Sequence, residues 1–376
     1  FYPVKSKTSA ECETLLRAAD ISSDDATTSR LTPPTPCPPI AAIASAVLLW
    51  LSFPLVAMCA KCFLTEKCVF SVKGSNFCHP LSAATLHLFL VGGFLVLIQA
   101  MHSLSRIICI RRLEQETLQQ HASLGQMIRL CAPVGLCFGC KYVVGHAALE
   151  FTPTPIYELF HCLNLVFCAI FARFVLNEKL QTCGEFTSVA GVVFGSAVAG
   201  YNALVNAAGV SWLALAFNLS NGILAGAVVV LLRTTMIQSH RRFVRVTSLK
   251  MLLGASCIFP FALWIEQGAL FHLTWHQIVW LSISSAAILV YHCNLSLLCY
   301  LATDAPTVAI VEALRPVPAF ILLVLLQQMT PKPLSFWIGS SVVLLSAVGY
   351  ELSRKFYSET RDKAEGKSET TAVLRS

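Results

Sequence analysis

Three polar side chains interrupt an otherwise apolar stretch of the sequence, residues 157–174. Glu158, His161 and Asn164 are spaced three residues apart, which places them on one side of a helix. Glu158 can serve as a proton-coupling group or as a counterion, and His161 gains positive charge when it is protonated. His161 can also serve only to hold neighbouring membrane helices together by a hydrogen bond. We expect this side of the segment to face a polar cavity.

A second acid–base pair lies in the apolar run 306–328. Glu312 and Arg315 are three residues apart, so they share a helix face. A charge in the middle of a membrane costs roughly 2.5–3.5 kcal/mol on insertion scales, and arginine cannot lose its charge. The guanidinium offers a planar set of donors that matches phosphate or carboxylate. The pair therefore predicts an anion site, or alternatively an ion pair that only stabilises the bundle.

Other polar residues in apolar segments could join that site. Lys141 could be a second cation in the cavity, or its long side chain could reach the membrane surface. His146 lies five residues later, and we expect it to point to a different face. Tyr157 could stack on a base or sugar, or anchor the helix at the interface. The same ambiguity between a cavity role and a packing role applies to Tyr142, Tyr291, His292 and Asn294.

Composition sets the class of protein that must position these residues. The chain of 376 residues is 56% hydrophobic and 12% charged, with a mean hydropathy of +0.68, whereas soluble domains carry about 25% charged residues. This predicts a polytopic membrane protein. The net charge of +7 does not predict nucleic-acid binding, because most basic residues lie in short loops. We find no P-loop, zinc-protease or nucleophile-elbow motif, so we expect no enzyme activity, cofactor or metal.

Most of the sixteen cysteines fall inside apolar runs, where they are expected to be small buried hydrophobic residues. Four of them surround the first loop instead, and their spacing favours a disulfide or free thiols over a zinc site; these are Cys59, Cys62, Cys68 and Cys78.

Ten segments have about the 20 residues needed to cross a bilayer, and polar tails at 1–38 and 356–376 flank them. Pro155 and Pro306 suit first helical turns. The segments are 40–64, 81–104, 127–149, 154–176, 184–204, 208–232, 248–268, 277–302, 306–328 and 333–353. With both tails on one side, that side collects most of the basic residues, Arg233 and Lys250 among them. This asymmetry predicts that both termini are cytosolic.

The two halves of the chain resemble each other. Residues "EFTPTPIYELFHCLNLVF" correspond to "LATDAPTVAIVEALRPVPAF", and "GSAVAGY" corresponds to "LLSAVGY". Glu158 and His161 each lie 154 residues before Glu312 and Arg315. We predict an all-α polytopic fold with ten transmembrane helices in two inverted five-helix repeats, residues 39–204 and 205–355. In such folds the substrate binds near the midplane between the repeats.

Several strings, in this order and spacing, resemble a known family. "FCHPLSAATLH", "PIYELFHCLNLVFCAIFARFVLNEKL", "FNLSNGILAGAVVVLLR" and "DAPTVAIVEALRPVPAFI" are similar to the triose-phosphate and nucleotide-sugar translocators of the drug/metabolite transporter superfamily, over roughly residues 40–355. The resemblance implies that Arg315 replaces a phosphate-binding lysine and that His161 replaces another lysine. Pro316 and His146 differ from the plastid sugar-phosphate exchangers. The resemblance therefore favours the nucleotide-sugar branch and the Golgi.

These observations predict an antiporter of an anionic, phosphate-bearing solute, with a nucleotide sugar as the expected class. Arg315 would bind phosphate, assisted by His161, Lys141, Tyr157 and Asn164, while Glu158 and Glu312 would couple the charges. The expected partners are the solute and its counter-substrate, the lipid bilayer and a second copy in a homodimer, in the Golgi or endoplasmic reticulum membrane. Two alternatives stay open: a proton-coupled metabolite exporter and a membrane scaffold that transports nothing.

Overall fold

The computed structural model describes twelve stretches of the chain, together with Tyr157. They are residues 43–52, 55–56, 79–110, 124–152, 160–161, 163–178, 182–206, 212–239, 243–267, 269–302, 304–314 and 334–373. Contacts divide the chain into residues 1–39 and 40–376, and both halves predicted from the sequence lie in the second unit. The four cysteines around the first loop lie outside the described residues.

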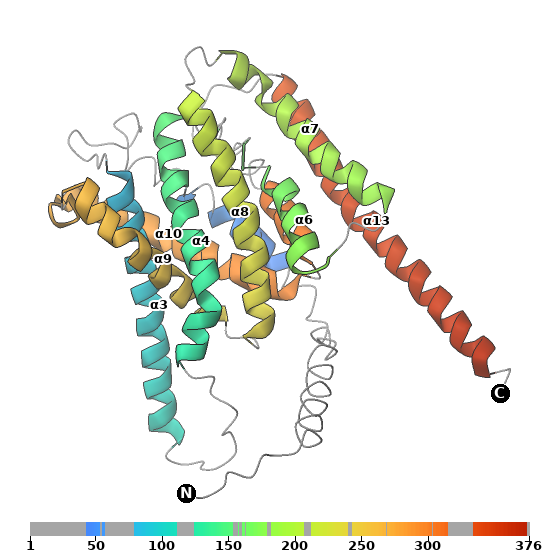
Figure 1. Ribbon diagram of the computed structural model, residues 1–376, viewed down its shortest axis with the longest axis horizontal. Helices are drawn as coiled ribbons and strands as arrows, with labels where there is room; N and C mark the ends of the chain where they lie inside the picture. Colours follow the sequence, from blue (N-terminus) through green and yellow to red (C-terminus); the bar gives the residue numbers. More distant parts are fainter. Residues whose placement is uncertain are drawn as a thin grey trace, which may run out of the picture. The chain divides into compact units, whose positions relative to one another are not determined.

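Every regular element of the described residues is a helix (Figure 1). The long helices are α3 (Pro80–Ile110), α4 (Leu124–Phe151), α7 (Cys183–Asn206), α8 (Trp212–Gln238), α9 (Phe243–Ile265), α10 (Trp275–Leu301) and α13 (Leu334–Val373). Shorter elements are Ile43–Ser52, α6 (Asn164–Val175), α11 (Ala305–Ala313) and a 3₁₀ turn, η1 (Ala269–Phe271).

Five of these helices are long and apolar enough to cross a membrane, and they lie within α3, α4, α8, α9 and α10. Large apolar side chains remain exposed on them; Trp212 and Trp264 are 86% and 80% exposed. A water-soluble surface does not carry so many exposed apolar groups, whereas lipid-facing helices require them. The predicted all-α fold is confirmed for the described residues, and these five helices are compatible with the predicted multi-pass membrane protein.

Some boundaries differ from the sequence prediction. The polar tail expected from residue 356 continues α13 to Val373, because its Glu, Lys, Ala and Arg residues have high helix propensity. In the predicted segment 154–176, α6 begins at Asn164, and Tyr157, Phe160 and His161 before it are also helical; the predicted start of this segment and Pro155 lie outside the described residues. The prediction for Pro306 is confirmed: it lies in the first turn of α11, whose N-cap is Asp304.

Helices from the first half of the chain pack mainly against helices from the second half (Figure 1). α3 lies along α9, α4 packs between α8 and α9, α6 packs against α8 and α11, and α7 lies along α13. Contacts within the first half are fewer. The core is therefore an interface between the two halves of the chain.

Glycines allow the closest of these helix pairs to form. A Cβ atom on Gly139 of α4 would lie 2.9 Å from the backbone oxygen of Gly254 in α9. A Cβ atom on Gly195 of α7 would lie 2.7 Å from the backbone oxygen of Gly339 in α13. Small residues let membrane helices approach until their backbones touch, and these two crossings fix α4 against α9 and α7 against α13.

Candidate functional site

A cavity lies between α4, α10 and the residues just before α6. Its empty volume, which includes space open to the outside, is about 520 Å³, and the space in which water-sized molecules can be centred is about 50 Å³. Most of the exposed wall is apolar, although seven of its ten lining residues are Lys, His or Tyr and so carry a polar group. The lining residues are Val56, Lys141, Tyr142, Gly145, His146, Leu149, Tyr157, His161, Tyr291 and His292.

Three residues predicted for the site line this cavity together. Lys141 is half-buried, while Tyr157 and His161 are 7% and 4% exposed. The Tyr157 and His161 rings meet edge to face, with centroids 6.1 Å apart. Two other predicted residues, Glu158 and Arg315, lie outside the described residues, so their roles stay predictions.

The expectation that Lys141 and His146 point to different faces is wrong, because both line the cavity. The lining residues of α4 recur at positions 141, 142, 145, 146 and 149, which is a stripe of helical period wide enough to include both. His146 Nδ1 donates to the backbone oxygen of Tyr142 at 3.0 Å. Nε2 of neutral His146 is then an acceptor, and it has no hydrogen-bond partner among the described residues.

Glu312 of α11 connects the two halves of the chain near this cavity. One carboxylate oxygen accepts a hydrogen bond from Asn164 Nδ2 at 2.5 Å, and the other accepts one from the Tyr291 hydroxyl at 2.5 Å. Asn164 belongs to α6, whereas Tyr291 belongs to α10 and lines the cavity. Glu312 and Asn164 are 4% and 1% exposed. The buried acid is thus held by donors from both halves, as buried charges require.

Aromatic and imidazole rings continue from this acid across the cavity wall. The centroid of the His292 ring lies 4.8 Å from the centroid of the Tyr291 ring and 4.8 Å from that of the Phe138 ring, and both pairs meet edge to face. The Tyr142 ring contacts the His146 ring, also at 4.8 Å. Both tyrosines and both histidines line the cavity. These flat surfaces can pack against a ring of a bound solute while nearby polar atoms fix its orientation.

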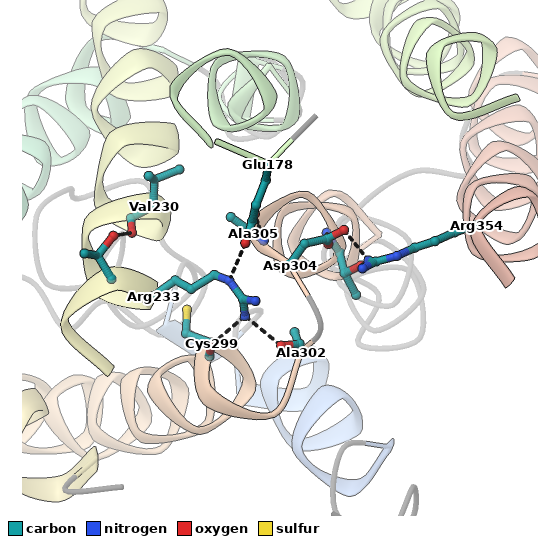
Figure 2. Close-up of polar contacts among 10 residues, drawn as sticks. Glu178, Val230, Arg233, Cys299, Ala302, Asp304, Ala305 and Arg354 are labelled. Atoms are coloured by element: carbon teal, nitrogen blue, oxygen red, sulfur yellow. Dashed lines mark hydrogen bonds and ion pairs between the residues drawn. The ribbon is translucent and has the colours of Figure 1, made fainter. Parts of the chain in front are cut away.

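A polar network lies at the other end of the bundle, where α6, α8 and α10 end and α11 begins (Figure 2). Arg233 of α8 is buried, and its Nε donates to Glu178 Oε1 at 3.0 Å. Its Nη1 donates to the carbonyl oxygens of Cys299 and Ala302 at 3.2 and 2.6 Å. Glu178 Oε2 accepts from the Ala305 backbone N–H at 2.9 Å. One ion pair therefore joins the ends of four helices.

Local sequence places the acids of this network. Asn177 adopts a left-handed backbone with φ of 55°, which asparagine tolerates better than most residues; it ends α6 and directs Glu178 toward α8. Asp304 caps α11 by accepting from the Thr307 N–H at 2.8 Å. Its other carboxylate oxygen pairs with Arg354 of α13, which also donates to the Thr307 hydroxyl at 2.9 Å (Figure 2).

Sequence reasoning missed Arg233 and Lys250 as buried groups and counted both with the charges at membrane ends. Arg233 is 6% exposed and Lys250 is fully buried. A signal was present, since the apolar pattern continues on both sides of each residue. Tyr291 and His292 were left undecided, because only the approach of α4 and α11 to α10 shows which side of α10 faces the cavity.

No protein-family model matches the chain, and no curated protein matches it in sequence. One solved structure, described only as the crystal structure of a protein, shares the fold over 82% of this chain and 98% of its own length. The two have a TM-score of 0.54 and 15% sequence identity. At this identity the likeness shows the arrangement of helices alone, so function must be argued from the site.

Proposed function

We propose that this protein is a secondary transporter that exchanges an anionic, phosphate-bearing organic solute, of the nucleotide-sugar class, by alternating access. The observation that carries the proposal is the kind of polar group that lines the cavity. Its lining holds the cation Lys141 and the histidines 146, 161 and 292, and no carboxylate occurs among the described lining residues. Such a wall attracts anions, and its tyrosines suit a ring-containing solute.

The position of the cavity supports transport over a static binding role. It lies in the core between helices of both halves, where α4 and His161 meet α10. Ionisable residues among membrane helices usually mark a pathway for a solute or ion. Glu312, bound by Asn164 and Tyr291, connects the same two halves, so a solute that alters this wall can alter how the halves pack.

The helix contacts support two inverted five-helix repeats. We pair α3 with α9, α4 with α10, α6 with α11, α7 with α13, and the helix Ile43–Ser52 with α8. If the repeats are related in this way, the contact of α4 with α9 should have an equivalent contact of α10 with α3. Both contacts occur. The contacts of α8 with α4 and α6 have counterparts in two hydrogen bonds: Ser45 Oγ to Asn294 Oδ1 at 3.3 Å, and Trp50 Nε1 to the Val311 oxygen at 2.8 Å.

The ion pair between Arg233 and Glu178, at the end of the bundle away from the cavity, supports alternating access. The cavity residues of α4 lie in its C-terminal half, and the network around Glu178 and Arg233 lies at the opposite end of the bundle. The network ties α6 to α8, α10 and α11, and thereby closes that end. With both termini in the cytosol, the closed end is the cytosolic one and the cavity faces the lumen.

The remaining parts of the proposal rest on the sequence. Arg315 binds the phosphate, His161 and Lys141 assist it, and Glu158 and Glu312 balance these charges when the cavity is empty. The resemblance to the nucleotide-sugar translocators favours the Golgi or endoplasmic reticulum membrane. Exchange follows from the same electrostatics. The cations that line an empty cavity repel each other, and a bound anionic counter-substrate removes this repulsion. The protein therefore changes between its two open states more easily when the counter-substrate is bound.

Uptake into liposomes tests the proposal. Purified protein is reconstituted with a nucleoside monophosphate inside, and uptake of a panel of nucleotide sugars and sugar phosphates is measured. Uptake stimulated by the internal nucleotide, and lost in Lys141→Met but kept in the exposed-lysine control Lys355→Met, is the expected result. The absence of stimulated uptake for every phosphate-bearing solute refutes the proposal.

The same liposomes separate the two other functions. A proton-coupled exporter predicts uptake that follows an imposed pH gradient without internal nucleotide and that survives Arg315→Lys. A scaffold predicts that neither nucleotide nor pH gradient moves any solute, and that Arg315→Ala leaves the cellular function unchanged.

A further inference from the structure

Lys250 is a fully buried cation in a helix that is apolar enough to cross the membrane. It lies eight positions into α9, and its side chain is 0% exposed. Its ammonium Nζ has no hydrogen-bond partner among the described residues. A buried ammonium normally has a carboxylate or several carbonyl groups around it, because leaving it unpaired in a low dielectric is costly. The cost therefore calls for a functional explanation.

Lys250 lies directly behind the wall of the cavity. Its Nζ is 4.8 Å from the centre of the Phe138 ring, and a cation in this position is attracted by the face of the ring. The Phe138 ring contacts the His292 ring at 4.8 Å, and His292 lines the cavity. Two rings that meet edge to face therefore lie between the ammonium and the cavity.

The close crossing of α4 and α9 holds Lys250 in this place. Gly139 and Gly254 bring the two backbones into contact, and Phe138 and Lys250 are one residue and one turn away from that contact. Lys141 and Glu312 are among the charged groups that act on Lys250 electrostatically. The acid Glu312 already receives hydrogen bonds from Asn164 and Tyr291, so Lys250 adds to the positive character of this region.

We propose that Lys250 is a specificity-determining residue that selects phosphate-bearing solutes by its positive charge behind the cavity wall. This proposal rests on the proposed function and adds a cation to the site that does not line the cavity. The charge acts through Phe138 and His292 without touching the solute, because all three side chains are buried and electrostatic interactions extend further in a buried region than in solution. The bound phosphate in turn relieves the cost of the buried ammonium.

Equilibrium binding to the purified full-length protein tests this role. The probes are inorganic phosphate, a purine and a pyrimidine nucleoside monophosphate, and nucleoside diphosphate sugars. We expect Lys250→Met to weaken binding of the phosphate-bearing probes by about tenfold or more, and Lys250→Arg to restore it to within about threefold of wild type. Lys355→Met, which removes an exposed lysine of α13, is the matched control and leaves binding unchanged.

The melting temperature of the ligand-free protein provides a second readout. Replacing an unpaired buried ammonium with an apolar side chain of similar length is expected to raise it or leave it unchanged. If Lys250→Met lowers the melting temperature or prevents folding, and Lys250→Arg does the same, the lysine is structural and the proposal is overturned. Unchanged affinity in Lys250→Met overturns it as well, and leaves the proposed function intact. If wild type binds none of the probes, both proposals fail together.

Discussion

Glu312 is the residue through which the two halves of the chain meet in the core. Asn164 and Tyr291 donate to its two oxygens from helices of different halves. An acid with two donors in a dry environment contributes little net stability compared with apolar packing, but breaking the set is costly because a buried charge then lacks partners. The bonds around Glu312 therefore determine which arrangement of α6, α10 and α11 is stable.

Asn164→Ala and Glu312→Gln should each destabilise the protein, and their effects should overlap. Asn164→Ala removes one of the two hydrogen bonds to Glu312, and Glu312→Gln leaves a single acceptor oxygen for the two donors Asn164 and Tyr291. We expect a loss of about 1–3 kcal/mol for each, with a coupling of about 0.5–3 kcal/mol. Thermal unfolding of detergent-solubilised single and double variants measures both. The exposed residue Arg173 supplies the control: Arg173→Met should be additive with Asn164→Ala. Strict additivity of Asn164→Ala with Glu312→Gln would contradict the assignment.

Arg233→Met should destabilise the end of the bundle at which the ion pair lies. The substitution leaves the Cys299 and Ala302 carbonyls and one Glu178 oxygen without the donors that they now have. We expect a loss of about 2–4 kcal/mol, or roughly 3–5 °C in melting temperature for a chain of this size. Arg173→Met removes an exposed arginine and should change little. An equal effect of the two substitutions would show that the network contributes nothing.

The sequence predicts which polar residues lie in apolar segments more readily than it predicts which of these residues contact each other. A polar residue in an apolar run is visible at once, so Asn164, His161 and Glu312 were identified from the sequence. The hydrogen bond between Asn164 and Glu312 is seen only in the structure. Tyr291 could not be assigned to that acid, because the contact depends on how α10 crosses α11. Lys250 looked like a charge at a membrane end because only packing against α4 shows that it is enclosed.

Helix crossings through glycine position the cavity wall. α4 carries five of the ten lining residues, and its contact with α9 at Gly139 and Gly254 leaves no room for a side chain. Periodicity predicted that these segments are helices, and the short loops limited where each one ends. It could not predict which glycines touch another backbone, because glycine at a crossing and glycine facing lipid look alike in sequence.

Gly139→Ala should destabilise the protein, whereas Gly93→Ala should not. A Cβ atom at residue 139 would lie 2.9 Å from the Gly254 oxygen, and a Cβ atom at residue 93 would meet nothing within 4 Å. We expect a cost of about 1–3 kcal/mol for the first from overpacking and a gain of about 0.5–1 kcal/mol for the second from helix propensity. Melting temperatures of the two variants check the difference. A milder effect at residue 139 than at residue 93 would contradict the crossing.

The two halves of the chain complete each other and do not form separate domains. The main partner of α3 is α9, that of α4 and α6 is α8, and that of α7 is α13, so all four find their main partners in the second half. The sequence suggested the two halves through the recurrence of short strings. It could not show that they interlock, because internal similarity alone is equally consistent with two bundles that fold side by side.

Splitting the chain should show this dependence. We expect residues 1–206 expressed alone to be degraded or aggregated, because most partners of α3, α4, α6 and α7 are missing. Co-expression of residues 1–206 with residues 207–376 should yield a complex that is purified through a tag on either part. Limited proteolysis in detergent measures the stability of each preparation. A fragment 1–206 as resistant as the full chain would refute the interlocked arrangement.

The pairing of α7 with α13 also constrains how the protein is made. α7 ends at Asn206 and α13 begins at Leu334, and at about 5–20 residues per second the ribosome needs on the order of ten seconds to reach the second helix after the first. During that interval the glycine-containing face of α7 lies in the membrane before its partner α13 exists. The protein therefore depends on whatever shields unpaired helices during insertion, and truncation near its end removes support from a helix made much earlier.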